Sequence, residues 1–478
     1  MMKSGHQRVR RSAKKVKKPK KKIREVSTDD LLKAASAAME SLDIERAYQA
    51  YHQAVTQLQK DNSSGVERAT NSTMQILIQV LEKMGELQVS MGDPDVAKEH
   101  FVQSLRLLEE GANAESAKST SFYETQSNLY FYIGQLCLGK EALEAYQRGI
   151  RSLEECMQRV EDQSIAPSAQ ETVAMQESTD DADNDKDSPM RTDADTSLRL
   201  RALINEKLSG AYCNLAELYL TDLCEEETAE NDCENNLEKA LQLKDGDGEP
   251  LVDALQTMAS LRLSQQERQL EAVPFILRAY EKQRVGSEAL ATLVGLQGDS
   301  KSSNGDDDKV QEVGQAQELL EVEAANNLPE FEFRCQTAKL LLECAELLRE
   351  SGNCMEDSMG PPNQADECVT AAISVLGSLL AQNDEVVEIW YLTGCAFAAK
   401  KPPLTDTAKF YLEQAKKMLT EIQKALKEET QFVGDSERPE LEERLKMNAT
   451  QMSDVQSKLD ALPSDEGEDG FCDKMDEA

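Results

Sequence analysis

Carboxylate and aromatic side chains recur at equivalent positions of a repeated helical pattern, and together they could bind an extended basic peptide. Each lies in the first helix of a predicted helix pair, either two residues before a bulky residue or one or five residues after it. In repeat arrays these positions line the inner surface. Carboxylates attract basic side chains, and aromatic rings supply apolar anchors. We therefore predict a peptide-binding groove formed by Asp29, Glu82, Glu86, Phe131, Glu217, Asp253, Glu346, Glu388 and Tyr391.

Catalytic and metal-binding motifs are absent from the sequence. The three histidines, His6, His52 and His100, have no metal-ligand spacing to a cysteine or to one another. There is no Gly-rich phosphate loop, no Gly-x-Gly-x-x-Gly and no Gly-x-Ser-x-Gly. Scattered acids on helices usually form solvated faces. The chain is therefore predicted not to be an enzyme and to carry no cofactor or metal.

The helices that must position the candidate residues follow a period of about 34 residues. The second pair reads Leu81-x2-Met84-Gly85-x2-Gln88 and then Ala97-x3-Phe101-x2-Ser104. The seventh reads Trp390-x2-Thr393-Gly394-x2-Phe397 and then Ala408-x3-Leu412-x2-Ala415. This order is typical of tetratricopeptide (TPR) repeats, in which small residues let two helices pack closely and an aromatic ring fills the gap between repeats. One repeat cannot bury its own apolar face, so several must stack.

The predicted fold is all-α, a TPR solenoid of about seven helix-turn-helix repeats with a C-terminal capping helix. Pro274 falls in the second helix of the fifth pair, where it is expected in the first turns or at a kink. Polar stretches that cannot bury enough apolar area to offset their ordering entropy are predicted to be disordered. The predicted order is a basic disordered tail at 1–27, N-terminal repeats at 28–160, an acidic disordered loop at 161–197, C-terminal repeats at 198–428 with polar inserts near 297–312 and 352–362, a capping helix at 436–461 and an acidic tail at 462–478.

The chain carries a net charge of −36, although its first 24 residues hold twelve Lys or Arg and no acid. The acidic body would repel nucleic-acid phosphates and attract basic partners. The same charge imbalance leaves an alternative interpretation of the groove open, in which its acids reflect only the acidic composition of the whole chain.

No apolar run has the length of a membrane span, and the N-terminus lacks the apolar core of a secretory signal. The eleven cysteines include no Cys-x-x-Cys pair and are expected to be reduced thiols packed in helices.

A dense basic run near the N-terminus is compatible with two functions. Import receptors read such clusters with acidic grooves, so the run is expected to act as a nuclear localisation signal. It could instead be a polybasic arm that contacts RNA or the acidic body of its own chain. The residues are Lys14, Lys15, Lys17, Lys18, Lys20, Lys21 and Lys22.

Three segments carry a more specific resemblance. They are Tyr219-Leu220-Thr221-Asp222-Leu223-Cys224, the stretch Ala254–Gln265 and the stretch Asp384–Gly394. In these segments the chain resembles the dedicated assembly chaperones of the fourth protein of the large ribosomal subunit. The likeness covers most of residues 28–475 and is strongest from 205 to 400.

The resemblance implies a partner and a route. Chaperones of this family capture a newly made, very basic ribosomal protein through its long internal loop, shield it from aggregation and escort it to nuclear pre-ribosomes. It also implies shuttling between cytoplasm and nucleus, and the basic run of the tail separately suggests importins as partners. The alternative from another class is a scaffold or adaptor in a nuclear complex, which would use the same groove for a different partner.

Overall fold

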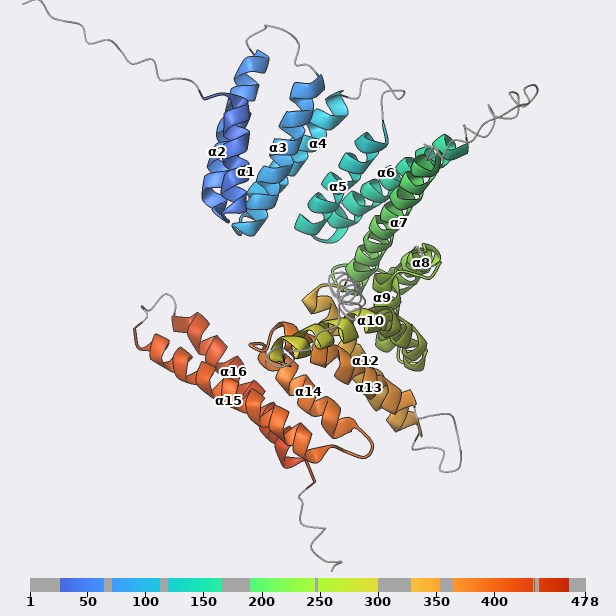
Figure 1. Ribbon diagram of the computed structural model, residues 1–478, viewed down its shortest axis with the longest axis vertical. Coiled ribbons are helices and arrows are strands. Elements are labelled where there is room, and N and C mark those ends of the chain that lie inside the picture. The colour runs from blue at the N-terminus through green and yellow to red at the C-terminus, as the bar shows by residue number, and fades with distance from the viewer. Residues whose placement is uncertain are drawn as a thin grey trace, which may run out of the picture. The chain divides into compact units, whose positions relative to one another are not determined.

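The computed structural model describes residues 26–63, 71–111, 119–165, 190–245, 248–299, 328–352, 364–432, 434 and 438–463. These residues form helices joined by turns, with one isolated bridge between Lys244 and Pro250. The predicted fold class is confirmed: the described residues form successive helix pairs of the TPR, α-solenoid type, followed by a final helix (Figure 1). None of the described helices combines the length and apolarity needed to cross a bilayer.

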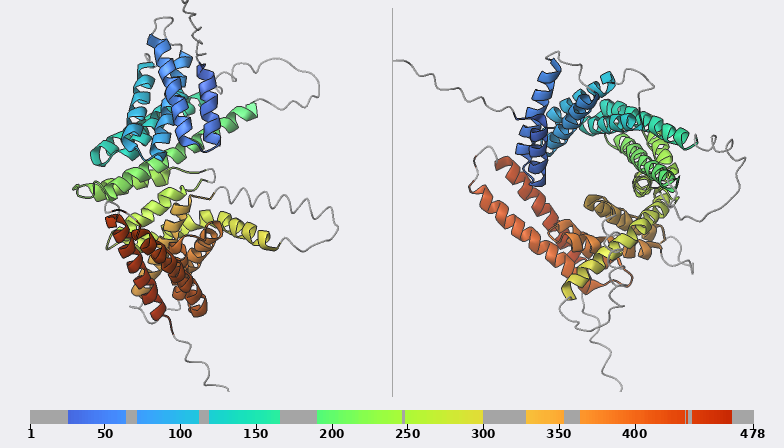
Figure 2. Two further views of the ribbon diagram at one scale, coloured as in Figure 1. Left: turned by 90° about the vertical axis from the view of Figure 1, so that its left-hand side faces the viewer. Right: turned by 45° about the horizontal axis from the view of Figure 1, so that its top comes forward.

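The chain divides into two compact units, and the first covers Met1–Leu136. In this unit each helix packs against the next one in the chain (Figure 2). Its helices are α1 (Thr28–Glu40), α2 (Ile44–Ser63), α3 (Asn71–Ser90), α4 (Pro94–Gly111) and α5 (Thr120–Leu136).

The second unit covers Cys137–Ala478. Its helices are α6 (Gly139–Ile165), α7 (Met190–Leu220), α8 (Ala229–Gln242), α9 (Val252–Ser264), α10 (Ala272–Asp299), α12 (Phe331–Gly352), α13 (Gln364–Gln382), α14 (Val387–Ala399), α15 (Thr405–Thr430) and α16 (Arg438–Asp460). The first helices of its successive pairs contact one another in chain order, α7 with α9, α9 with α12 and α12 with α14. Groove positions of consecutive pairs in this unit therefore lie on neighbouring helices.

Close packing of a small residue on a large one holds the second and seventh pairs together, as the motif predicts. A Cβ added to Gly85 of α3 would lie 2.5 Å from the ring of Phe101 on α4. The Phe101 ring is fully buried and stacks on Tyr132 of the next helix pair, with 4.7 Å between centroids. The seventh pair uses the same device, because a Cβ on Gly394 would lie 2.6 Å from Leu412 Cγ.

Several predicted boundaries need correction. Helix α6 continues to Ile165 and α7 begins at Met190, so both ends of the predicted acidic loop are helical, while residues 166–189 lie outside the described part. The division between units falls between α5 and α6, inside the third predicted repeat rather than at the acidic loop. Helix α10 begins at Ala272, which places Pro274 in its first turn, as predicted. Helix α16 agrees with the predicted capping helix within two residues at each end.

Two predicted terminal segments lie almost wholly outside the described residues. Of the basic tail only Val26 and Ser27 are described, and Ser27 caps α1 by accepting a hydrogen bond from the Asp30 amide at 3.2 Å. The lysine cluster at 14–22 is outside the described part, as are residues 464–478 of the acidic tail and most of the two polar inserts.

Candidate functional site

In the first unit, two predicted groove acids share one face of α3. Glu82 and Glu86 are one helical turn apart and are both half-buried. Glu86 forms an ion pair with Lys83 at 2.6 Å and accepts a hydrogen bond from the Tyr132 hydroxyl at 3.1 Å. Burial raises the pKa of Tyr132 to about 12, and the charges of Glu86 and Glu82 act in the same direction. Glu86 is therefore partly neutralised before any partner arrives.

The other predicted residues of this unit lie on different helices. Asp29 is exposed in the first turn of α1, and Phe131 is half-buried on α5. Glu82 also lines a cavity of about 460 Å³ between α3, α4 and α5, whose walls include Ile78, Leu107 and Phe122. The cavity offers apolar surface next to a carboxylate, which suits an amphipathic side chain.

In the second unit, three carboxylates of adjacent helices gather without an ion pair among the described residues. Glu206 and Glu217 lie on α7, and Asp253 lies in the first turn of α9. Loss of hydration raises the pKa of Asp253, and repulsion from Glu206 adds to the shift. The pKa of Glu217 is raised by the same cause, reinforced by Asp253, although Glu217, like Glu206, is exposed and only Asp253 is half-buried. We call Glu206, Glu217 and Asp253 the carboxylate cluster.

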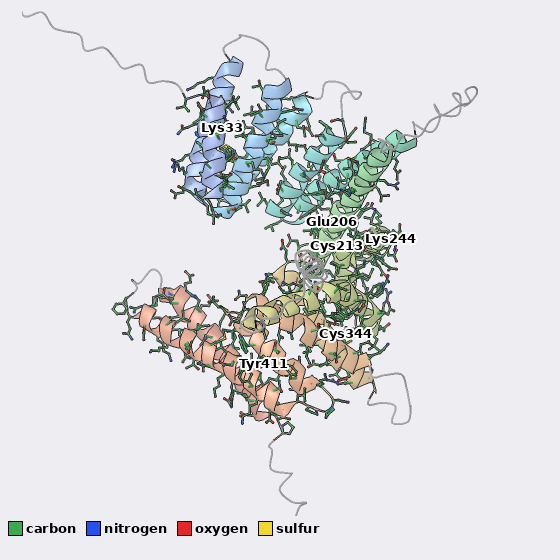
Figure 3. The ribbon with its side chains drawn as sticks, viewed as in Figure 1. Lys33, Glu206, Cys213, Lys244, Cys344 and Tyr411 are labelled. Atoms are coloured by element: carbon green, nitrogen blue, oxygen red, sulfur yellow. The ribbon has the colours of Figure 1, made fainter. Side chains whose placement is uncertain are left out.

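Cys213 lies close to two members of the carboxylate cluster, Glu217 and Asp253. This thiol lies seven residues after Glu206 on α7, which is two helical turns along the same face (Figure 3). Burial raises its pKa to about 12, and the charges of Asp253 and Glu217 add to the rise. The thiol is therefore protonated at neutral pH, and its polar neighbours are Thr257 and Ser209.

The electrostatics of the cluster favour a positively charged ligand. Like charges that lie close together repel one another, and this repulsion persists in the free protein at neutral pH. The macrodipole of α9 favours Asp253 in its first turn, but burial and Glu206 outweigh it because the pKa is raised. A lysine or arginine side chain that enters between the carboxylates would replace repulsion by attraction.

At the C-terminal end of the second unit, the predicted residues lie on α12 and α14. Glu388 forms an ion pair with Lys339 at 2.8 Å, and these side chains are 52% and 38% exposed, so the pair adds little stability. Tyr391 is half-buried and has a hydrogen bond with Cys395, and the charge of Glu346 acts on both. Glu346 and Tyr391 are therefore neighbours.

The structure brings some predicted residues together and adds others. Glu217 with Asp253, Glu82 with Glu86, and Glu346 with Tyr391 are brought together. Glu206 was missed because it lies six residues before the bulky Tyr212, outside the range of the positional rule, and Tyr132 because it lies two residues after the bulky Tyr130, at a position that the rule does not use. Glu206 lies eleven residues before Glu217, three full turns away on the same face of an unusually long helix, so helical periodicity could have found it.

The raised pKa values of Glu217 and Asp253 predict that the site costs stability. The pKa of each carboxyl is higher in the folded state than in the unfolded state. The free energy of unfolding therefore falls as the pH rises from the unfolded-state pKa through the folded-state pKa, and the destabilisation is present at pH 7. We expect the double variant Glu217→Gln, Asp253→Asn to raise the melting temperature at pH 7 on the order of 1–2 °C.

The difference should shrink as the pH is lowered through the raised pKa values, because the wild-type carboxyls then become neutral too. Differential scanning calorimetry from pH 7 to pH 4 measures it. Glu238→Gln on the exposed surface of α8 is the control and should melt as wild type does. A double variant that melts below wild type at pH 7 would show that the cluster does not repel itself.

Within the described part of the chain, no group of three His, Cys, Asp or Glu side chains has the geometry of a metal site. The candidate residues are carboxylates, phenols and one phenyl ring, which bind cations and apolar groups. The chemistry that they support is non-covalent recognition of a basic, partly apolar chain.

No family model matches the chain. Among solved structures, residues 1–338 of the assembly chaperone of RpL4, Acl4, superpose with a TM-score of 0.44 at 20% identity, over 78% of this chain and 95% of that one. The nuclear import adaptor Nro1 of Schizosaccharomyces pombe superposes with a TM-score of 0.35 at 12% identity, over 79% of this chain and 99% of that one.

One curated relative is similar in sequence. It is the probable assembly chaperone of rpl4 of Schizosaccharomyces pombe, which is 27% identical over 187 residues. The aligned stretch covers 39% of this chain and 40% of the relative. The resemblance to assembly chaperones of the fourth large-subunit ribosomal protein, which rested on three specific segments, is confirmed by this relative.

Proposed function

We propose that this protein is a dedicated chaperone of a newly made, basic ribosomal protein of the large subunit, the counterpart of rpl4. The chaperone binds the extended internal loop of that ribosomal protein on the inner faces of the first helices of its helix pairs. It prevents aggregation of the ribosomal protein and escorts it to nuclear pre-ribosomes. The name of the sequence relative supports the choice of partner.

The carboxylate cluster is the observation that carries this proposal. Glu206, Glu217 and Asp253 place three negative charges on neighbouring helices, without a basic partner among the described residues, and the pKa values of Glu217 and Asp253 are raised by partial loss of hydration and by mutual repulsion. Surface acids that serve only solubility stay well hydrated and keep ordinary pKa values. Repelling carboxylates that lower stability make physical sense where a cationic ligand repays the cost on binding.

The same electrostatics explain protection and release. An unassembled ribosomal protein is built to bind rRNA phosphates, so it associates with any polyanion it meets. An acidic repeat surface competes for its basic loop and holds it in solution. Mature binding sites on rRNA offer more phosphates and additional contacts, so the ribosomal protein transfers there when assembly presents them.

Affinity purification of the tagged, full-length protein tests the partner. Mass spectrometry is expected to find one basic large-subunit ribosomal protein as the dominant co-purifying species. The purified protein should also keep that ribosomal protein soluble at low salt, as measured by light scattering. A multi-subunit nuclear complex without a ribosomal protein would instead support a scaffold or adaptor function.

Nuclear delivery is proposed to depend on the basic run at 14–22. Changing Lys14, Lys15, Lys17, Lys18, Lys20, Lys21 and Lys22 to Ala is expected to reduce nuclear accumulation of a fluorescent fusion severalfold, because import receptors recognise such clusters by charge. Binding of the ribosomal protein should be unchanged, since the candidate groove residues lie elsewhere. Unaltered import would mean that another segment carries the signal.

A further inference from the structure

The second unit contains a cavity that the repeat pattern does not anticipate. It lies between α14, α15 and the final helix α16 and has a volume of about 310 Å³. Helix α14 contributes Val387, Glu388 and Tyr391, and the rest of the lining is Leu419, Gln451, Asp454 and Val455. A volume at the lower end of ligand pockets suits one or two side chains rather than a large cofactor.

The walls of this cavity combine two kinds of surface. Leu419 and Val455 are buried and belong to one apolar cluster, against which Val387 and Tyr391 pack. Two carboxylates line the same cavity, Glu388 from α14 and Asp454 from α16. Burial raises the pKa of Tyr391, with Cys395 and then the charge of Asp454 acting in the same direction. An apolar floor therefore lies beneath a negatively charged rim.

We propose that this cavity binds one lysine or arginine side chain of the extended client segment, so that α16 is part of the binding surface. The proposal rests on the proposed function and adds a second subsite to the carboxylate cluster. The aliphatic stem of a basic side chain would cover Val387, Leu419 and Val455, while its charged head would meet Glu388 and Asp454. The ring of Tyr391 would offer a cation–π contact.

Other side chains fit this cavity less well. An acidic side chain would be repelled by Glu388 and Asp454, and a purely apolar one would remove water from these carboxylates without compensation. The side chain of Lys339 already contacts Glu388 from outside the cavity lining, at 2.8 Å. Lys339 would therefore compete with the bound cation for one of the two carboxylates.

The position of the cavity also restricts the spacing of basic residues in the client. Helix α9, which carries Asp253 of the cluster, contacts α12, and α12 contacts α14. Packed helices lie about 8–10 Å apart, so two steps span roughly 20 Å. An extended chain covers about 3.3 Å per residue, so two basic residues about six positions apart would reach both subsites.

Trp390 provides a local probe of the cavity. It is the single tryptophan of the chain, precedes Tyr391 and packs against the same apolar cluster. The binding probe is a synthetic Gly–Ser peptide with two arginines six residues apart, and its control carries neutral citrulline in place of both arginines. Titration of the full-length protein with the arginine peptide is expected to shift Trp390 fluorescence, whereas the citrulline peptide should not.

Three single variants sharpen the test. Asp454→Lys should weaken arginine-peptide binding about five- to tenfold, because it reverses a charge on the cavity rim. Glu443→Lys makes the same change on the same face of α16, about 16 Å away, and should stay within twofold of wild type. Lys339→Met should tighten binding about two- to fivefold, because it removes the competing cation.

The outcomes separate this proposal from the function it rests on. Equal binding of arginine and citrulline peptides overturns the basic subsite, as do Asp454→Lys titrations that match wild type. In that case, capture of the ribosomal protein in the affinity purification still upholds the chaperone. If the arginine peptide binds as expected while no ribosomal protein is captured or kept soluble, the subsite stands and the proposed function fails.

Discussion

Reversing Glu217 and Asp253 to lysine is expected to weaken binding of the ribosomal protein at least about 100-fold, while the helical content of the protein stays the same. Close charge pairs across a protein interface are coupled by about 1.5–7 kcal/mol, and reversal at two positions replaces attraction by repulsion. Both residues belong to the carboxylate cluster, and neither forms an ion pair within the described residues. Isothermal titration calorimetry at about 0.1 M salt, where the Debye length is about 10 Å, measures the loss.

The matched control reverses Glu238 and Glu421, which are exposed on α8 and α15, the second helices of their pairs. This change alters the net charge equally but leaves the inner faces intact, so its effect should be within a few-fold of wild type. Reversing Glu86 and Glu388 should give an intermediate loss, since Lys83 and Lys339 already neutralise them in part. Equal losses in all three variants would mean that bulk charge, rather than a shaped site, holds the client.

Truncation of Phe101 to alanine is expected to destabilise the first unit by about 3–5 kcal/mol. The ring is fully buried, fits against Gly85 and stacks on Tyr132, so its removal leaves a cavity and loosens two helix pairs at once. Urea denaturation followed by circular dichroism should show helix loss at lower urea than in wild type, with an amplitude set by the first unit.

Phe410→Ala is the control for this truncation, because the Phe410 side chain is 53% exposed on α15. Its removal uncovers little apolar surface and should shift the midpoint only slightly. Phe101 would not have the packing role described above if both alanine variants unfolded at the wild-type urea concentration.

The sequence predicted the helix pairs well because their signal is local. Gly85 and Phe101 are sixteen residues apart and belong to one pair, so the motif itself records their contact. The ends of α6 and α7 were missed at Ile165 and Met190, because acidic and polar residues are tolerated on exposed helix surfaces as well as in disordered loops. Composition alone does not separate these two cases.

The candidate site was predictable only in part, because its chemistry depends on neighbours from other helices. Position within the repeat identified Glu388, but only packing of α12 against α14 reveals that Glu388 pairs with Lys339. Asp454 was missed because α16 was interpreted as a polar cap. A positional rule derived from a single repeat does not say which helix packs against the last repeat of the array.

The carboxylate cluster forms no ion pair with any described residue, and this has a consequence for the speed of capture. Uncompensated charge of one sign steers an oppositely charged partner, and association rates rise from about 10⁵–10⁶ to about 10⁸ M⁻¹s⁻¹. At about 1 μM protein, encounter then takes about 10 ms instead of about 1–10 s. Ribosomes add about 5–20 residues per second, so a basic loop would be bound before the next residue is added, while its own chain is still being synthesised.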